Sequence, residues 1–325
     1  MHLKNKLFTI KSVLNQNLFK KRVPLSVSWT LTNRCNKKCD YCNLPNITSK
    51  ELKTKQIISI IEDLSKLGTQ RIGFTGGEPL LRKDIKEIID FSHDEGIFTG
   101  MISNGSLVNK YIQKIKNLDL LQLSLDGPQW INDRQRYQGS YKDVINALKV
   151  AINKIPNIWL TSVLTKNNLN SIHFILDLAE QYNSKVFFQP VVNYDNCGVH
   201  ANNLVPVETE YKQTIKKLIK IKKINKHIGN SRVGLDYLYH WPIPQKLKCY
   251  SGKLFSHIYP NGDIYPCFNM DGKKHLNCLR NGFEKAFTSL KIKDCSGCFT
   301  YANIEMNYLF NFNLNAGLNC LKLMD

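Results

Sequence analysis

Three cysteines near the start of the chain have the spacing of iron-sulfur ligands. The segment TNRCNKKCDYC places Cys35, Cys39 and Cys42 in a CxxxCxxC pattern directly after an apolar, β-branched run. Three thiolates on one loop can hold three irons of a 4Fe-4S cluster, which leaves the fourth iron without a protein ligand. Zinc is the alternative, but a zinc site would here lack its fourth cysteine or histidine. An iron with an open position can bind a reactant.

Further cysteines gather in the last quarter of the chain. Four of them form a second candidate site: Cys249, Cys267, Cys295 and Cys298. They could close one 4Fe-4S cluster, although two such pairs also make a structural zinc ribbon. The remaining three cysteines are Cys197, Cys278 and Cys320. We interpret Cys278 and Cys320 as buried or bystander thiols rather than substitute ligands, and Cys197 as a small packed residue rather than a catalytic donor.

Polar and glycine-rich turns follow several predicted strands. The second strand is followed by Thr75, Gly76, Gly77, Glu78 and Pro79. The third and fourth strands end in Ser103-Asn104-Gly105 and Ser124-Leu125-Asp126-Gly127. Because parallel sheets present ligand sites at the carboxyl ends of their strands, these residues are candidates for one common site, with helix capping as the structural alternative.

The elements that position these residues alternate between strand and helix. Strands are predicted at 26–32, 71–75, 99–103, 120–125, 159–165 and 186–191, and helices between them include 55–67 and 83–95, each ended by a glycine. This pattern predicts an α/β fold with a parallel sheet, a partial (β/α)6 barrel two units short of eight. Brief strand signals at 254–259 and 264–265 follow in a Cys-, Gly- and Pro-rich region that can bury little apolar surface by itself.

Over about residues 24 to 192, the cysteine motif and the turns together resemble the radical S-adenosylmethionine (SAM) superfamily. The resemblance implies that a reduced cluster on the three cysteines cleaves SAM to methionine and a 5′-deoxyadenosyl radical, which takes hydrogen from a substrate. It also implies that Tyr41 lies near the adenine of SAM and that the run Gly76, Gly77, Glu78, Pro79 binds the methionine amino group. Arg136, favoured over Arg134, would contact the methionine carboxylate. Further SAM-binding roles fall to residues at the strand ends, namely Ser103, Asn104, Ser124 and Asp126.

The C-terminal cysteines resemble the auxiliary-cluster extension of the same superfamily. The wording YPNGDIYPC is close to that extension, but the full SPASM form would carry two more cysteines after CxxC, where this chain has FTYANIEMN. The resemblance therefore implies the shorter Twitch form, with one auxiliary 4Fe-4S cluster near the open end of the barrel that accepts an electron from the substrate radical. A flavodoxin or ferredoxin is the expected electron donor.

The substrate remains open between several classes. The short extension favours oxidation or bond formation on a small molecule, as in the aminocyclitol dehydrogenase branch. A peptide maturase is the alternative, against which only 34 residues precede Cys35, too few for a winged-helix leader-binding domain. A molybdopterin-type GTP cyclase would need a glycine-rich tail that NAGLNCLKLMD does not provide. A non-catalytic metal-binding module would leave the turn at Glu78 unexplained.

The formal net charge of +19 is concentrated in two segments. The first 22 residues contain six Lys or Arg and no acid, and YKQTIKKLIKIKKINKH contains seven Lys and no acid. Apolar residues at helical spacing (Leu3, Leu7, Ile10, Leu14 and Ile215, Leu218, Ile219) predict amphipathic helices with basic outer faces. The charge is compatible with a solvated surface, an anionic membrane surface or substrate, or a nucleic acid, the last disfavoured because no RNA-binding motif is appended.

The composition fits a cytoplasmic protein. A hydrophobic content of 42% is typical of globular chains, no window approaches the length of a membrane-spanning helix, and the basic N-terminus lacks a signal-peptide core. Reducing conditions there favour metal or cluster ligands over disulfides. We expect a basic segment at 1–23, the barrel at 24–200, a basic helical connection at 201–245 and the cluster domain at 246–325, with possible peripheral attachment to a membrane.

Overall fold

The computed structural model describes residues 3–39, 41–42, 44–191, 202–269, 276–292, 295 and 297–323. It confirms the six strands predicted for the barrel, with bounds that differ from the predictions by two residues at most. They are β1 (Ser26–Thr32), β2 (Arg71–Gly76), β3 (Phe98–Ser103), β4 (Leu120–Ser124), β5 (Asn157–Leu164) and β6 (Lys185–Pro190). All of them pair in parallel in the order β6-β5-β4-β3-β2-β1.

The C-terminal region continues this sheet. Strand β7 (Phe255–Ile258) pairs in parallel with β1, with Ser26 beside Phe255 and Trp29 beside Ile258. Strand β8 (Ile264–Tyr265) then returns antiparallel to β7. The cysteine-rich segment is therefore joined to the barrel through main-chain hydrogen bonds at the β1 edge, and the sheet has eight strands among the described residues.

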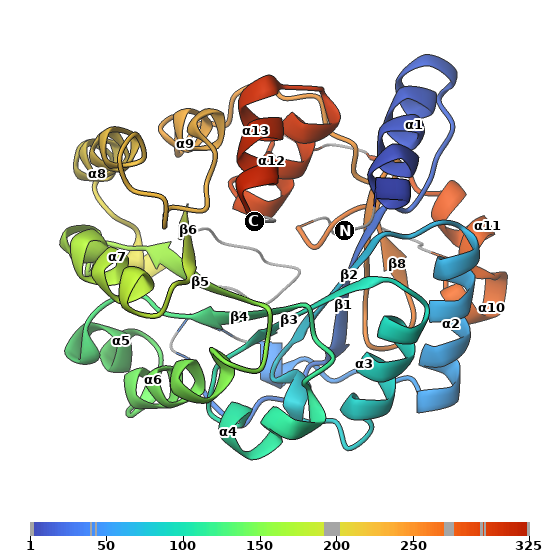
Figure 1. Ribbon diagram of the computed structural model, residues 1–325, viewed down its shortest axis with the longest axis horizontal. Coiled ribbons are helices and arrows are strands. Elements are labelled where there is room, and N and C mark those ends of the chain that lie inside the picture. The colour runs from blue at the N-terminus through green and yellow to red at the C-terminus, as the bar shows by residue number, and fades with distance from the viewer. Residues whose placement is uncertain are drawn as a thin grey trace.

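Helices cover the convex face of the sheet (Figure 1). The covering helices are α2 (Thr54–Lys66), α3 (Ile85–Asp94), α4 (Val108–Tyr111), α5 (Gln129–Gln135), α6 (Ser140–Ala151) and α7 (Ile172–Gln181). In α2, Ile57, Ile60, Ile61 and Leu64 are buried at helical spacing against the sheet. The remaining described helices are α1 (Leu3–Phe19), α8 (Glu208–Ile221), α9 (Arg232–Leu238), α10 (Cys278–Asn281), α11 (Phe283–Thr288), α12 (Tyr301–Phe310) and α13 (Leu314–Lys322).

The concave face of the sheet lines the barrel interior. Val27 and Trp29 of β1 pack in the core under the helices, so the intervening Ser28 points to the concave side. Gly73 of β2 and Gly100 of β3 lie level with Ser28 across neighbouring strands. A Cβ atom built on Gly73 would meet no atom within 4 Å. Small residues therefore leave room inside the barrel at this level.

Helix α12 closes the amino-terminal end of the interior. Its first residue, Tyr301, stacks on Phe187 of β6 with ring centroids 4.6 Å apart, and Phe187 in turn contacts Trp159 of β5 at 4.7 Å. The guanidinium carbon of Arg71, the first residue of β2, lies 5.7 Å from the Trp159 ring centroid. These aromatic contacts form a floor at the starts of the strands.

The two basic helices differ in how they pack. Helix α8 follows the prediction, because Ile215 and Leu218 are buried and its lysines lie outside. The expectation for α1 is wrong: Leu7, Ile10 and Leu14 are exposed, and α1 instead buries the face that carries Val13. Hydrophobic spacing gives the position of a stripe on a helix but not the side that faces the protein. None of the described helices has the length and hydropathy needed to span a membrane.

Candidate functional site

The loop that carries Cys35, Cys39 and Cys42 begins where β1 ends and is fixed by an ion-pair network. Arg34 donates two hydrogen bonds to Glu51, from Nε at 2.8 Å and from Nη2 at 2.9 Å. Arg82 lies 3.4 Å from the same carboxylate and donates to Asp84 at 2.7 Å. Thr32 also donates to Glu51. The start of the loop is therefore held before any ligand binds.

The glycine turn after β2 lies directly against the start of this loop. The Gly77 amide donates to the Thr32 carbonyl and the Glu78 amide donates to the Arg34 carbonyl, both at 2.8 Å. A Cβ atom would stand 2.2 Å from the Thr32 oxygen if built on Gly76, and 2.2 Å from the Arg34 oxygen if built on Gly77. The two glycines are thus required for the turn to pack against the cysteine loop.

Glu78 connects this turn to the end of β3. Its carboxylate is fully buried and accepts hydrogen bonds from the Ser103 hydroxyl at 3.0 and 3.1 Å and from the Asn104 amide at 2.9 Å. The Asn104 side chain lies 3.7 Å from the Cys35 sulfur. Burial raises the pKa of Glu78 to about 7, against backbone and hydroxyl donors that lower it. The structure thus brings Glu78, Ser103 and Asn104 together beside Cys35.

A second group of predicted residues meets on the other side of the cysteine loop. The Arg136 guanidinium places Nε 2.7 Å from the Asp126 carboxylate and lies 5.8 Å from the centre of the Tyr41 ring. Arg136 is buried, whereas Arg134 is exposed on α5. Burial by itself would lower the pKa of Arg136, but Asp126, Tyr41 and Cys39 raise this pKa by more than burial lowers it. The guanidinium therefore stays protonated. Its position fits a cationic contact for an anionic group beside the loop.

Asp126 is in turn held by β5, since its carboxylate accepts a hydrogen bond from the Val163 amide at 2.8 Å. Ser124, the last residue of β4, lies level with Thr161 of β5 and is partly exposed. Burial raises the pKa of the Cys39 thiol to about 11, while Arg136 works against that rise. A cluster bound by this thiol would therefore have to drive its deprotonation, as metal binding to thiols generally does.

Sequence reasoning missed a support beneath the loop. The Lys37 ammonium lies 4.3 Å from the centre of the Tyr137 ring and 3.1 Å from the Asp143 carboxylate. The Tyr137 hydroxyl donates toward the Asn104 carbonyl at 3.3 Å and toward Asp143 at 3.2 Å. The basic residue inside the cysteine motif and the aromatic residue just after Arg136 could have suggested this cation–π contact.

The C-terminal thiols form a second group at the opposite end of the barrel. Cys249 precedes β7, which runs parallel to β1, and Cys267 follows the antiparallel β8, so both lie near the amino-terminal edge of the sheet. They pack with Val23 and Leu25, which lead into β1. The Cys249 thiol interacts electrostatically with Cys295, and the Cys267 thiol interacts with both Cys249 and Cys295. The Cys298 thiol interacts with Cys249 and Cys267. The four predicted ligands are thus neighbours in space.

Amide and side-chain donors surround these sulfurs. Backbone groups of Asn269 and Thr300 bond to Cys267 and Cys298, and Asn303 approaches the Cys298 sulfur at 4.0 Å. Burial raises the pKa of Cys298 to about 12. Hydrogen bonds to ligand sulfurs tune the potential of an iron-sulfur cluster, so this donor set suits one. Among the described side chains, no three His, Cys, Asp or Glu are arranged to hold a single metal ion.

The other cysteines do not join either group where they are described. Cys278 is buried in the main hydrophobic core, as expected of a bystander thiol. Cys320 lies on α13, and its electrostatic neighbour is Arg71 at the floor of the barrel. Cys197 lies outside the described residues.

One buried imidazole faces the interior between the two thiol groups. His257 of β7 lies level with Ser28, and its Nε2 is 3.1 Å from the Thr30 hydroxyl. Burial lowers the pKa of His257 to about 3, so the ring is neutral. Sequence reasoning did not single it out because a histidine in a short apolar run carries no spacing signal.

Comparisons with known proteins agree with this geometry. The family model described as the Radical SAM superfamily matches residues 29–179, a stretch that includes the cysteine loop and the turn at Glu78. An uncharacterised protein of Methanocaldococcus jannaschii is 29% identical over 281 residues, which cover 83% of this chain and 92% of that protein. A PqqA peptide cyclase of Bradyrhizobium diazoefficiens is 24% identical over 259 residues, which cover 75% of this chain and 67% of that enzyme.

The fold is also found in a solved structure. Streptococcus suis SuiB, bound to its precursor peptide SuiA, aligns with a TM-score of 0.64 over 86% of this chain and 69% of that chain, at 16% identity. This likeness supports the α/β radical SAM fold that the sequence predicted.

The contact between the glycine turn and the cysteine loop gives a first prediction. Gly77→Ala places a methyl group 2.2 Å from the Arg34 carbonyl and should force the turn and the loop apart. After anaerobic reconstitution, the variant should lose about four of about eight irons. Gly317→Ala is the matched control, since a Cβ there meets nothing within 4 Å. Full iron content in Gly77→Ala would contradict this account of the loop.

The buried carboxylate gives a second prediction. Because the pKa of Glu78 is raised from 4.5 to about 7, the folded state keeps a proton that the unfolded state loses, and this contribution to stability falls as pH rises between those values. Glu78→Gln, measured by urea denaturation across this range, should remove that part of the pH dependence. Glu95→Gln, at an exposed position, should retain it. An unchanged slope in Glu78→Gln would show that the carboxylate ionises normally.

Proposed function

We propose that this chain is a radical SAM enzyme that modifies a peptide, with one 4Fe-4S cluster at Cys35, Cys39 and Cys42 and an auxiliary 4Fe-4S cluster at the four C-terminal cysteines. The observation that carries the choice of substrate is the match to PqqA peptide cyclases. At 259 residues, the first of these matches is longer than the radical SAM domain. The peptide is therefore favoured over the small molecule that the short extension suggested.

The residues beside the first cluster site suit the binding of SAM. The cationic Arg136 is proposed to contact the methionine carboxylate, and Tyr41, against which it packs, to contact the adenine. The turn at 76–79 would receive the amino group, with Glu78 holding Ser103 and Asn104 in place rather than exposing its own oxygens. Asp126 orients Arg136 through their 2.7 Å contact.

The interior between the two thiol groups suits a substrate side chain. The barrel interior has room at the height of Ser28, Gly73 and Gly100. Ile102, on the same face of β3 as Gly100, is 39% exposed. When bound, the two clusters would supply an electron to SAM and take one from the substrate radical. Shielding that radical from water and from other hydrogen donors is then the work of the barrel wall. A flavodoxin or ferredoxin would supply the reducing electrons.

The auxiliary site gives a third prediction, which separates a cluster from structural zinc. In the full-length chain, Cys35→Ala, Cys39→Ala and Cys42→Ala together should leave about four irons of about eight. Iron at the auxiliary site would support its role as electron acceptor. One zinc and no iron in this triple variant would exclude that role while leaving the radical SAM domain unaffected.

The fourth prediction tests the function itself. The reconstituted enzyme, given SAM, dithionite and a short peptide encoded beside its gene, should form 5′-deoxyadenosine and remove hydrogen from the peptide, as seen by mass spectrometry. Cys295→Ala with Cys298→Ala should still form 5′-deoxyadenosine but no modified peptide, because the first cluster needs only its own three thiolates. Oxidation of a small metabolite, with no effect of any peptide on 5′-deoxyadenosine formation, would overturn the peptide assignment.

A further inference from the structure

Helix α1 packs with its hydrophobic stripe facing outward. Leu7, Ile10, Leu14 and Leu18 recur on one side of the helix and are 60%, 51%, 43% and 68% exposed. The side that packs against the protein carries Ser12, Val13 and Gln16, all buried. A surface helix of a soluble domain normally does the reverse. Among the described residues, the outward stripe therefore has no partner that buries it.

Helix α13 presents a similar stripe. Leu314, Leu318 and Leu321 lie three or four residues apart on this helix and are 83%, 61% and 50% exposed. The turn that precedes α13 adds Phe312, which is 48% exposed. Large exposed hydrophobic residues are common singly, but a stripe of them on each of two helices marks an interaction surface.

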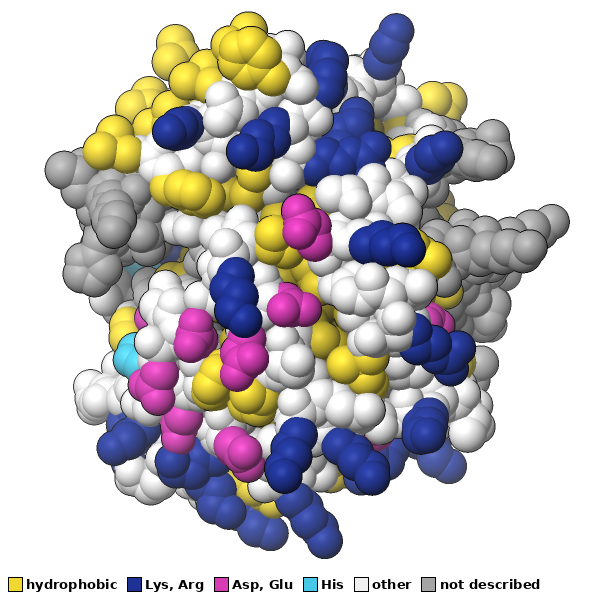
Figure 2. Space-filling view, turned by 90° about the vertical axis from the view of Figure 1, so that its right-hand side faces the viewer, with side chains coloured by type: hydrophobic (Ala, Val, Ile, Leu, Met, Phe, Trp, Pro, Cys, Tyr) yellow, Lys and Arg dark blue, Asp and Glu magenta, His cyan; other side chains and the backbone are white. Residues whose placement is uncertain are grey.

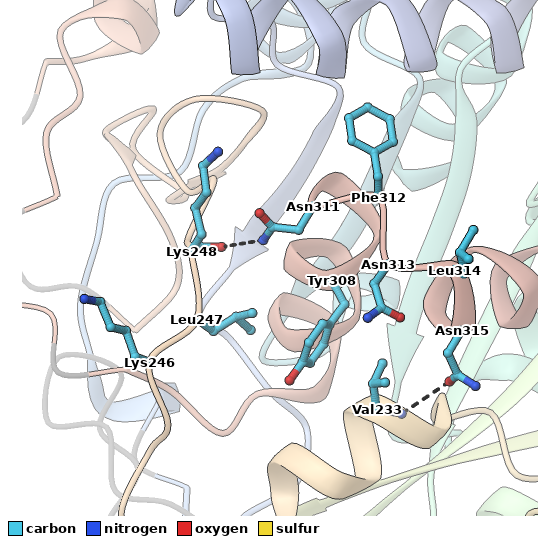
Figure 3. Close-up of a pocket in the computed structure, with 10 residues that line it drawn as sticks. All are labelled: Val233, Lys246, Leu247, Lys248, Tyr308, Asn311, Phe312, Asn313, Leu314 and Asn315. Atoms are coloured by element: carbon cyan, nitrogen blue, oxygen red, sulfur yellow. Dashed lines mark hydrogen bonds between the residues drawn. The ribbon is translucent and has the colours of Figure 1, made fainter.

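Helix α1 is linked to the α12–α13 turn through the end of α12. The Asn17 side chain of α1 donates to the Phe310 carbonyl at the end of α12, at 3.3 Å, and accepts from the Lys248 ammonium at 2.5 Å. Val13 packs in the same small cluster as Phe310. Beside this contact lies an open pocket, shown in Figure 3, between the 246–248 segment and the end of α12 with the start of α13, and its lining includes Lys248, Phe312 and Leu314. We call α1, the turn at Phe312 and α13 the docking surface.

Positive charge accompanies the hydrophobic residues. The first 22 residues contain six Lys or Arg and no acid, and the pocket adds Lys246 and Lys248. The acid on neighbouring α9, Asp236, is already paired with Arg232 at 3.0 Å. In Figure 2 the upper part of the molecule, where α1 lies, carries hydrophobic side chains in yellow and Lys and Arg in dark blue, and the visible acids in magenta lie lower.

We propose that the docking surface binds an anionic lipid bilayer, with the leucine stripes of α1 and α13 buried at the level of the headgroups and the lysines beside them paired with lipid phosphates. Interfacial helices combine these same two features, an apolar face with Leu and Phe and a high content of Lys and Arg. Charge complementarity selects this partner, because a second copy of a chain with net charge +19 would bring like charges together.

The docking surface lies behind the auxiliary thiols. Val13 of α1 packs in one cluster with Cys267, with Cys249 against it, at the amino-terminal edge of the sheet. Binding to a bilayer would therefore leave the loop of Cys35, Cys39 and Cys42, at the other edge, directed away from the lipid. The proposal does not depend on the substrate of the enzyme.

The fifth prediction tests this surface with the full-length protein. Wild type should cosediment with vesicles of phosphatidylglycerol and phosphatidylcholine, release as ionic strength rises, and bind vesicles of phosphatidylcholine alone far more weakly. Leu14→Glu with Leu18→Glu should lower the partition coefficient about tenfold or more, because two leucines that the bilayer would bury are lost and two negative charges face the lipid phosphates. The iron content of the variant should equal that of wild type.

A matched control adds the same two charges elsewhere. Val207 and Ile224 flank α8 and are 60% and 91% exposed, so Val207→Glu with Ile224→Glu changes net charge equally at the two ends of this basic helix. This control should retain at least half of the binding. An equal loss in both variants would mean that overall charge and not the docking surface binds the vesicles, and would overturn the proposal. So would equal binding to neutral and anionic vesicles, or a dimer in light scattering that Leu14→Glu with Leu18→Glu abolishes.

Discussion

The site depends on the close approach of two backbone segments, the end of β1 and the turn after β2. Two main-chain hydrogen bonds join them, from Gly77 to Thr32 and from Glu78 to Arg34. The same contact leaves no space for a side chain at Gly76 or Gly77. Because the cysteine loop continues directly from Arg34, its position follows from this contact.

The contact also determines where Glu78 lies. The carboxylate leaves the turn toward the end of β3 and organises Ser103 and Asn104, and Asn104 in turn reaches the Cys35 sulfur. A carboxylate with no exposed surface is costly to ionise, which its raised pKa reflects. This cost is offset because the same oxygens accept hydrogen bonds from a backbone amide and a hydroxyl at the end of a strand, which would otherwise be buried without partners.

Sequence patterns identified what depends on local order and missed what depends on packing between distant segments. The barrel strands could be predicted because each is a continuous apolar run, and β1 has the predicted bounds, Ser26–Thr32. The pairing of β7 with β1 could not, since 229 positions separate Val27 from its neighbour Ser256 and a four-residue run carries no partner signal. The side on which α1 packs was missed for a related reason, because its hydrophobic stripe was assumed to face the protein.

The pairing of β7 with β1 has a consequence for the chemistry. A parallel strand added at this edge brings its preceding residues, including Cys249, to the starts of the strands, whereas the loop after β1 lies at their ends. The two thiol groups are therefore separated by the height of the barrel, with Ser28, Gly73 and His257 on the wall between them. A group bound at that height would lie between the loop proposed to hold the SAM-binding cluster and the thiols proposed to hold the auxiliary cluster. The topology of one short strand thus places both sites around one interior, and a separate cluster domain tethered by a linker would not do so.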